Sequence, residues 1–176
     1  MRFCIKLEYD GHGYAGWQRQ ENAKSVQSCI EDAAKNLLGE DVLIFGSGRT
    51  DSGVHALGQF CHFDCSKKFE SYEIRDGLNY YLKEEKISIL FAQEVSQNFH
   101  SRFSAIERSY VYKIINRRSP PAIDFNKKWH IPLRLDVEKM KLAAEFLIGT
   151  HDFSTFRGAN CQSKSPVKKI DKILII

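Results

Sequence analysis

Hydrophobic and polar residues alternate along residues 3–9, "FCIKLEY", with the period of two that a β-strand imposes on its side chains. From Ser25 onward the apolar residues instead recur at the three- and four-residue spacing of an α-helix. Ser25 is a good N-cap for this helix, and Gly39 lies where a C-terminal glycine is expected. Its apolar stripe is Val26, Cys29, Ile30, Ala33, Ala34, Leu37 and Leu38.

The next hundred residues repeat these two kinds of pattern. Residues 42–49, "VLIFGSGR", and residues 57–65, "LGQFCHFDC", predict strands that enter and leave a glycine-rich loop. Residues 71–82 predict a second helix, and residues 86–95 a further strand. The order β, α, β, β, α, β is that of a ferredoxin-like (split βαβ) domain, with both helices on one face of an antiparallel sheet. We therefore expect an α+β fold.

The pattern begins again after this point but is not completed. Residues 108–116, "RSYVYKIIN", predict a strand, and residues 117–129 predict a loop because they contain two consecutive prolines. Residues 136–148 predict a helix with Asp136 as N-cap, and residues 167–176 a last strand. We interpret residues 1–98 as a first ferredoxin-like half and residues 99–176 as an incomplete second half.

The chain of 176 residues contains no apolar run long enough to cross a membrane, which takes about 18 residues. Its N-terminus, "MRFCIKLEYDG", lacks the apolar core and the cleavage site of a signal peptide. These features predict a cytoplasmic protein that does not bind a membrane.

Charge is distributed unevenly. Residues 1–100 hold 11 Lys and Arg against 15 Asp and Glu, whereas residues 101–176 hold 15 against 7. A basic half is typical of proteins that bind a polyanion such as nucleic acid, because each neutralised phosphate releases counterions. An ordinary solvated surface explains the same numbers equally well.

Five cysteines, at positions 4, 29, 61, 65 and 161, form no CxxC pair and are odd in number, so reduced thiols are the simpler interpretation. Cys61, His62 and Cys65 resemble a metal-binding cluster. On a strand, however, the two cysteines share one face and His62 points to the other. We therefore predict no metal site.

The glycine-rich loop is "GSGRTDSGVHALGQ", residues 46–59, and Asp51 is its only acidic residue. One interpretation is a tight turn in which Asp51 accepts main-chain hydrogen bonds. The other is a reactive carboxylate kept ionised by a cation such as Arg49, on a loop whose glycines let a ligand approach. His55 is interpreted as a hydrogen-bonded structural residue rather than as the catalytic base.

A second stretch combines aromatic and basic residues. If residues 108–115 form a strand, Arg108, Tyr110, Tyr112 and Ile114 share one face. That face either packs within a sheet or offers a stacking surface for a nucleobase beside cationic side chains.

Five segments together resemble the tRNA pseudouridine synthase A family, in the order that is found in the family. They are "YDGHGYAGWQRQ", "GSGRTDSGVHALGQ", "FHSRFSAIERSYVYKI", "GTHDFSTFR" and "CQSKSPVKKI". The "GRTDxGVHA" motif is highly specific for this family. The resemblance implies two ferredoxin-like halves that share one antiparallel sheet, with a cleft between them.

The resemblance also implies an activity. Members of this family are isomerases that convert uridine to pseudouridine at positions 38, 39 and 40 of the anticodon stem-loop of tRNA, without a cofactor. Asp51 would be the nucleophile, attacking either the uracil ring or the sugar C1′. Tyr110 would contact the uracil ring, and Arg49 would help to hold the flipped nucleotide.

The resemblance further implies a homodimer with tRNA bound across both subunits. Family members continue beyond the position of Ile176 with a helix whose basic residue pairs with the catalytic aspartate, so the chain is expected to be truncated relative to the family. The alternative interpretation is a catalytically inactive RNA-binding remnant of that family.

Overall fold

The computed structural model describes residues 1–124, 126–158 and 165–176. These residues form two compact units, Met1–Tyr110 and Val111–Ile176, and each is considered by itself below. Cys161 and the first four residues of the "CQSKSPVKKI" segment lie outside the described residues.

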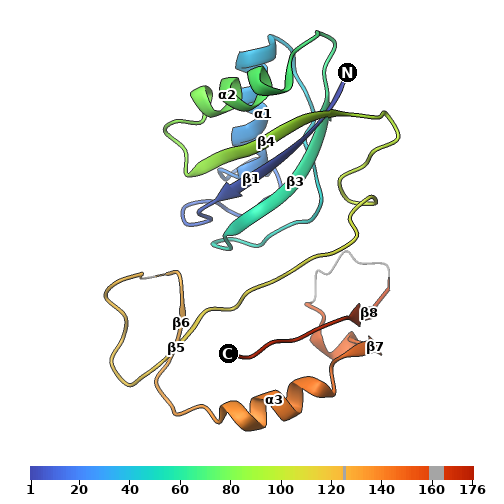
Figure 1. Cartoon of the computed structure of the whole chain (residues 1–176). Helices are drawn as coiled ribbons and strands as arrows, with labels where there is room; N and C mark the ends of the chain where they lie inside the picture. Colours follow the sequence, from blue (N-terminus) through green and yellow to red (C-terminus); the bar gives the residue numbers. More distant parts are fainter. Residues whose placement is uncertain (125, 159–164) are drawn as a thin grey trace. The chain divides into compact units, whose positions relative to one another are not determined.

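Unit 1 contains a four-stranded antiparallel sheet and two helices (Figure 1). Its elements are β1 (Arg2–Tyr9), α1 (Val26–Leu38), β2 (Phe45–Gly46), β3 (Ala56–Asp64), α2 (Ser71–Tyr81) and β4 (Ile87–Val95). The strands lie in the order β2-β3-β1-β4, and every neighbouring pair is antiparallel. The predicted β, α, β, β, α, β order and the α+β class are confirmed.

The core of unit 1 lies between the sheet and the two helices. Alternate residues of β1, namely Phe3, Ile5 and Leu7, are fully buried. Ile74 and Leu78 of α2 are buried in the same core cluster as the apolar stripe of α1. Both helices lie on one face of the sheet (Figure 1). Each large apolar side chain removed from water contributes about 1.5 to 3 kcal/mol, so this layer holds the sheet in place.

Both ends of α1 are as the sequence predicts. The hydroxyl of Ser25 accepts a hydrogen bond from the amide of Ser28 at 3.1 Å, which caps the first turn. Gly39 ends the helix at φ 72°, and its amide donates to the carbonyl of Lys35 at 2.9 Å.

The strand predicted over residues 42–49 is much shorter in the structure, where β2 contains only Phe45 and Gly46. The side chains of α1 explain this difference. The main-chain amide of Ile44 donates to Glu31, and its carbonyl accepts from Gln27, so this residue bonds to the helix instead of to a strand.

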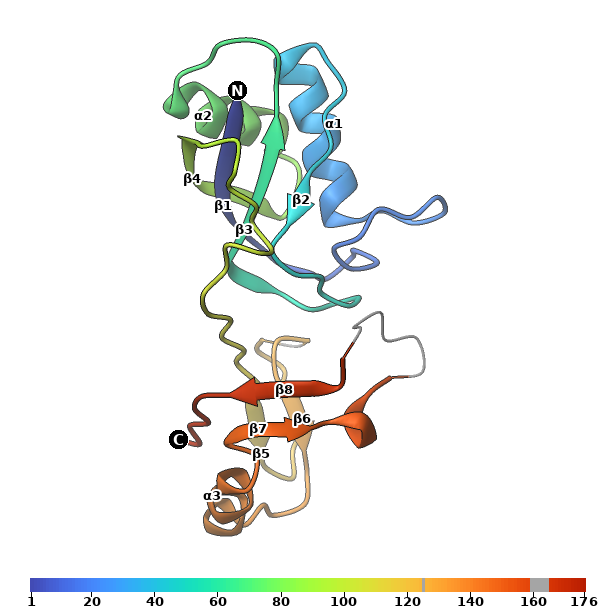
Figure 2. The same cartoon turned by 90° about the vertical axis from the view of Figure 1, so that its right-hand side faces the viewer.

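Unit 2 contains two small sheets and one helix (Figure 2). Its elements are β5 (Ile114–Asn116), β6 (Trp129–Ile131), α3 (Val137–Glu145), β7 (Gly149–Asp152), a 3-10 turn (Ser154–Phe156) and β8 (Val167–Ile170). Strand β5 pairs with β6 in parallel, and β7 pairs with β8 in antiparallel orientation. The predicted cap is confirmed, because the Asp136 side chain accepts from the Lys139 amide at 3.1 Å.

Two predictions for this region were wrong. Residues 108–113 are not a strand, and β8 ends at Ile170 instead of continuing to Ile176. Strands β6 and β7 were not predicted, the first because it follows a proline-containing loop. A strand requires a hydrogen-bonded neighbour as well as an alternating sequence, and the sequence pattern reports only the second.

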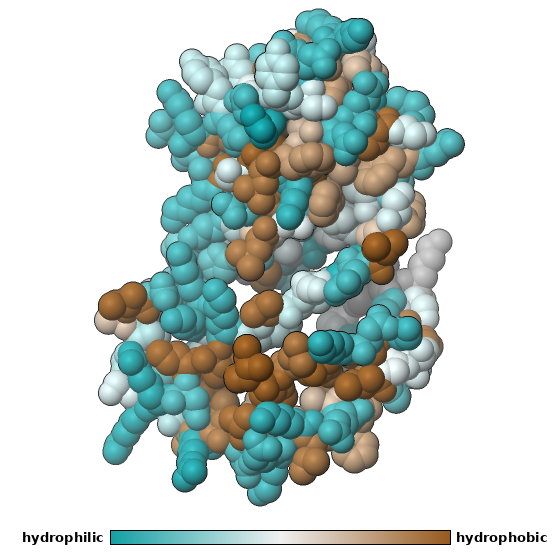
Figure 3. Space-filling view, viewed as in Figure 1, coloured by the Kyte–Doolittle hydropathy of each residue, from teal (hydrophilic) through white to brown (hydrophobic). Residues whose placement is uncertain are grey.

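Unit 2 has much less interior than unit 1. Among its described residues none is buried, and many large apolar side chains are exposed, including Trp129, Leu133, Leu142, Phe146 and Phe156. Apolar side chains cover much of the surface of this unit in the space-filling view (Figure 3). Unit 1 therefore supplies the stable scaffold for the loop that carries Asp51.

Candidate functional site

Asp51 lies in a turn between β2 and β3. The amide of Val54 donates to the main-chain carbonyl of Asp51 at 3.2 Å, and Gly53 has the positive φ of 78° that this turn requires. The main-chain carbonyl of Asp51 thus closes the turn, and the side-chain carboxylate takes no part in this hydrogen bond. Asp51 itself is exposed.

The loop between β1 and α1 supports this turn from one side. The amide of Trp17 donates to the carbonyl of Thr50 at 2.9 Å. A Cβ placed on Gly16 would stand 2.6 Å from the Thr50 carbonyl oxygen, and one on Gly11 would stand 2.1 Å from the Val54 carbonyl oxygen. Only glycine allows the two loops to approach so closely.

Side chains fix the same two loops together. The hydroxyl of Tyr9, at the end of β1, lies 2.8 Å from Thr50 Oγ1, and the hydroxyl of Ser52 donates to the Tyr14 carbonyl at 3.1 Å. Residues on both sides of Asp51 are therefore anchored, and these contacts fix the main chain that carries its carboxylate.

His55 has the structural surroundings that the sequence suggested. Its Nδ1 lies 3.0 Å from Asp10 Oδ1 and 3.1 Å from the amide nitrogen of Gly11. These contacts join the end of the Asp51 turn to the loop after β1.

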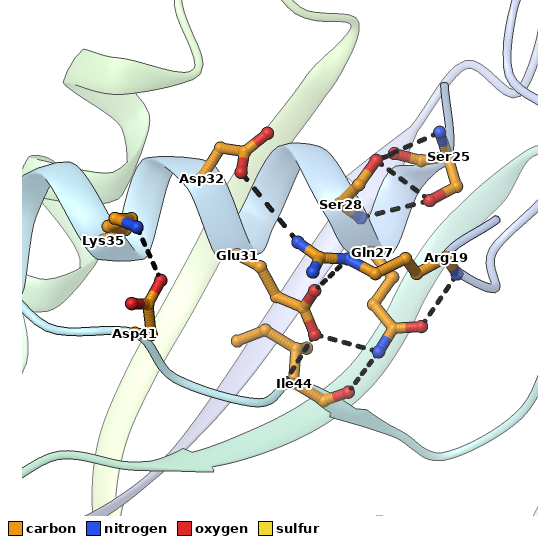
Figure 4. Close-up of polar contacts among 9 residues, drawn as sticks. All are labelled: Arg19, Ser25, Gln27, Ser28, Glu31, Asp32, Lys35, Asp41 and Ile44. Atoms are coloured by element: carbon orange, nitrogen blue, oxygen red, sulfur yellow. Dashed lines mark hydrogen bonds and ion pairs between the residues drawn. The ribbon is translucent and has the colours of Figure 1, made fainter. Parts of the chain in front are cut away.

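The buried carboxylate of Glu31 holds the segment that leads into β2 (Figure 4). Its Oε1 accepts from the Ile44 amide at 3.1 Å and from Gln27 Nε2 at 3.0 Å. Arg19 Nε lies 2.8 Å from Oε2, although its N–H is not aligned for a hydrogen bond, so charge attraction dominates this contact. Arg19 is thereby held within unit 1.

The sequence offered a signal for this cluster that our interpretation passed over. Gln27 and Glu31 are polar residues four positions apart, and they lie between the apolar positions of the α1 stripe. Polar side chains on the buried face of a helix need partners, which here are Arg19 and Ile44.

A shallow depression of about 440 Å³ adjoins the Asp51 turn. On its wall, Lys24 Nζ lies 2.6 Å from a Glu85 carboxylate oxygen, and the hydrogen bond to Glu85 raises the pKa of this lysine. The depression is lined by His12, Gly13, Tyr14, Ala15, Ala23, Lys24, Ser52 and Gly53. It gives the turn a concave surrounding in which the one lysine is paired with a carboxylate.

The three site residues expected from the sequence lie in different settings. Arg49 and Asp51 are both exposed and share one loop. Tyr110 is the last residue of unit 1, is 72% exposed and belongs to no strand, so the expected aromatic strand face of Tyr110 and Tyr112 does not form. The structure therefore groups Arg49 with Asp51 and leaves Tyr110 outside their loop.

Cys61, His62 and Cys65 lie along and just after β3, and all three are buried. His62 Nδ1 lies within hydrogen-bonding distance of Ser101, and Cys4, Cys29, Cys61 and Cys65 are free thiols. Within the described residues no group of three His, Cys, Asp or Glu side chains is placed to hold a metal ion.

None of the helices in the described part of the chain is both long and apolar enough to span a membrane.

Comparison with known proteins identifies relatives across the whole chain. The family model described as tRNA pseudouridine synthase matches residues 6–104. The tRNA pseudouridine synthase A of Maricaulis maris is 49% identical over 99% of this chain, and that of Sinorhizobium fredii is 51% identical over 98%. The Anaplasma phagocytophilum protein of the same name is 48% identical over 100%. The chain spans 70% to 72% of the length of these three relatives.

Proposed function

The chain belongs to the tRNA pseudouridine synthase A family, and on that premise we propose that it isomerises uridine to pseudouridine in the anticodon stem-loop of tRNA. The proposed targets are positions 38, 39 and 40. The observation that carries this proposal is the exposed Asp51, which lies in a turn anchored on both sides of it.

Asp51 acts as the nucleophile in this proposal. Its carboxylate attacks the target nucleoside at the uracil ring or at C1′ of the ribose, and both routes stay open. The bond from N1 to C1′ breaks, the base turns, a bond from C5 to C1′ forms, and the bond between Asp51 and the nucleoside breaks to return the free carboxylate. The proton lost from C5 is balanced by one gained at N1, so the product is an isomer and the reaction needs no redox cofactor.

Arg49 and Tyr110 bind the substrate in the same proposal. Arg49 is two residues before Asp51 on the exposed loop, where a guanidinium can contact the phosphate of a flipped nucleotide. Tyr110 provides an exposed ring that can stack on uracil. Extruding a stem nucleotide costs a few kcal/mol, and phosphate contacts from the basic residues after residue 100 offset that cost.

We assign the two halves of the fold, the cellular location and the partners on the same premise. The strand order β2-β3-β1-β4 with two helices supports a ferredoxin-like first half, residues 1–98, and we assign residues 99–176 to the second half. We further propose that the protein acts in the cytoplasm as a homodimer with tRNA as its partner.

The test is a pseudouridine assay on an anticodon stem-loop with uridines at the three target positions, comparing wild type with Asp51→Asn. We expect product from the wild type and none from the variant. Because the Asp51 carbonyl closes the turn, the substitution leaves that hydrogen bond in place. A matched control is Asp41→Asn, which changes an exposed aspartate ten positions away and is expected to keep full activity.

Product from Asp51→Asn at the wild-type rate would exclude Asp51 as the nucleophile. If wild type retained the stem-loop but formed no pseudouridine, the alternative of a catalytically inactive RNA-binding protein would stand instead.

A further inference from the structure

Strand β2 forms the edge of the sheet in unit 1 and contains only two residues. It pairs with β3 on one side, and proteins often cover the open side of such an edge strand with a loop. Residues 99–108, which we call the strap, contact main-chain carbonyls at and just after this strand. The hydroxyl of Ser101 donates to the Phe45 carbonyl at 2.5 Å, and Arg108 Nη2 donates to the Ser47 carbonyl at 3.2 Å.

The first of these contacts is anchored in the interior. Ser101 is 2% exposed, and its amide donates to Nδ1 of the equally buried His62 at 3.2 Å. The ring of Phe45 stacks on that of His62, with centroids 5.0 Å apart. His62 lies on β3, so this end of the strap is attached to the strand next to β2.

Arg108 makes the second contact from the surface. Its Nη2 also donates to the Arg102 carbonyl at 2.9 Å, so one guanidinium nitrogen ties the strap to itself and to Ser47. The Ser47 amide donates in turn to the Phe60 carbonyl of β3 at 2.8 Å. Ser47 is therefore held on both sides, four residues before Asp51.

We propose that the strap positions the Asp51 loop by holding β2 and Ser47, and that Arg108 is a positioning residue for the proposed isomerisation. The inference rests on the proposed function for its catalytic consequence. Arg108 acts through the main chain of Ser47, and its contribution is distinct from a charge that attracts RNA. Ser101 acts through Phe45 in the same way and carries no charge at all.

The experiment compares Ser101→Ala, Arg108→Gln and Arg102→Gln in the full chain. Arg102→Gln is the matched control because it removes one positive charge, as Arg108→Gln does. It leaves in place the Arg102 carbonyl that accepts from Arg108. The measurements are the rate at saturating anticodon stem-loop, the RNA affinity, and amide hydrogen exchange at Ser47 and Trp17, with Ile5 of β1 as an internal reference.

We expect Ser101→Ala and Arg108→Gln to slow the reaction about tenfold. We also expect amide exchange at Ser47 to become about tenfold faster relative to Ile5, because each variant loses one hydrogen bond. Arg102→Gln should change only the RNA affinity. Wild-type exchange at Ser47 in both strap variants, or equal acceleration at Ile5, would refute the strap. Identical effects of Arg108→Gln and Arg102→Gln would make Arg108 a phosphate contact instead. If wild type forms no pseudouridine, the proposed function fails, and the exchange data still decide the strap.

Discussion

The indole of Trp17 packs against Gly46, so closely that a Cβ on residue 46 would stand 2.7 Å from Cε2 and Nε1 of the ring. Trp17 is 2% exposed, and Gly46 is the last residue of β2 before the Asp51 loop. The position of the loop thus depends on contact between a buried aromatic ring and a residue without a side chain.

We predict that Gly46→Ala destabilises the protein by about 1 to 3 kcal/mol, because the added methyl group has no room beside Trp17. The measurement is the free energy of unfolding in urea. Gly48→Ala is the matched control, since a Cβ there has nothing within 4 Å, and it should change stability by less than about 1 kcal/mol. Equal costs at the two positions would contradict the packing argument.

The Glu31 cluster makes a second prediction for stability. Glu31→Ala leaves the Ile44 amide without its buried acceptor and should cost about 2 to 4 kcal/mol. Glu31→Gln keeps an oxygen acceptor and loses only the charge that attracts Arg19, so about 1 to 2 kcal/mol is expected. Asp32→Asn, on the exposed side of α1, should cost less than about 0.5 kcal/mol. A cost at Asp32 as large as at Glu31 would show that burial does not set the ranking.

The lowered pKa of His62 predicts that the free energy of unfolding depends on pH. Burial, followed by the charges of His100 and Arg2, lowers the pKa of His62 from 6.5 to about 4. Between these two values the unfolded chain binds the proton and the folded protein does not, so stability falls as pH drops from about 6.5 to about 4. The loss contributed by this one group at pH 4 is on the order of 3 kcal/mol.

The measurement is the unfolding free energy of wild type and His62→Gln at several pH values between 4 and 7. The variant removes the titrating group, so its stability should decline less steeply over this range. Parallel curves for the two proteins would show that other groups, such as carboxylates, account for the whole decline.

The two units should differ in their ability to fold alone. Residues 1–110 contain every buried residue among those that the structure describes, and none of the described residues after Ser101 is buried. We expect a 1–110 fragment to unfold cooperatively and a 111–176 fragment to be unfolded, because too little apolar surface is buried to offset chain entropy. Circular dichroism during urea titration decides this, and a cooperative transition in the second fragment would contradict it.

Several features of unit 1 could be predicted from the sequence because their causes are local. The apolar stripe of α1, its Ser25 cap and its terminal Gly39 all follow from residues within one helix length, and the structure confirms each of them. The order of six elements follows from alternation and from helical spacing, which are properties of single segments. The motif around Asp51 also identified the family, which the relatives confirm.

The site was predictable only in part. The sequence placed Arg49 and Asp51 in one loop because they are two residues apart, but it could not tell that the Asp51 carbonyl closes the turn. The expected strand face of Tyr110 and Tyr112 failed because no neighbouring strand pairs with it among the described residues. The roles of Arg49, Asp51 and Tyr110 in catalysis stay proposals.

The sequence by itself determined the kinds of element in unit 1, their order and the family to which the chain belongs, since these depend on residue types and short spacings. Tertiary structure alone decided that Trp17, Glu31, Ser101 and Arg108 hold the segment from Ile44 to Thr50. These contacts join residues between 13 and 61 positions apart. Their hydrogen bonds and close packing exist only after the sheet has brought distant segments together, and no local pattern records that geometry.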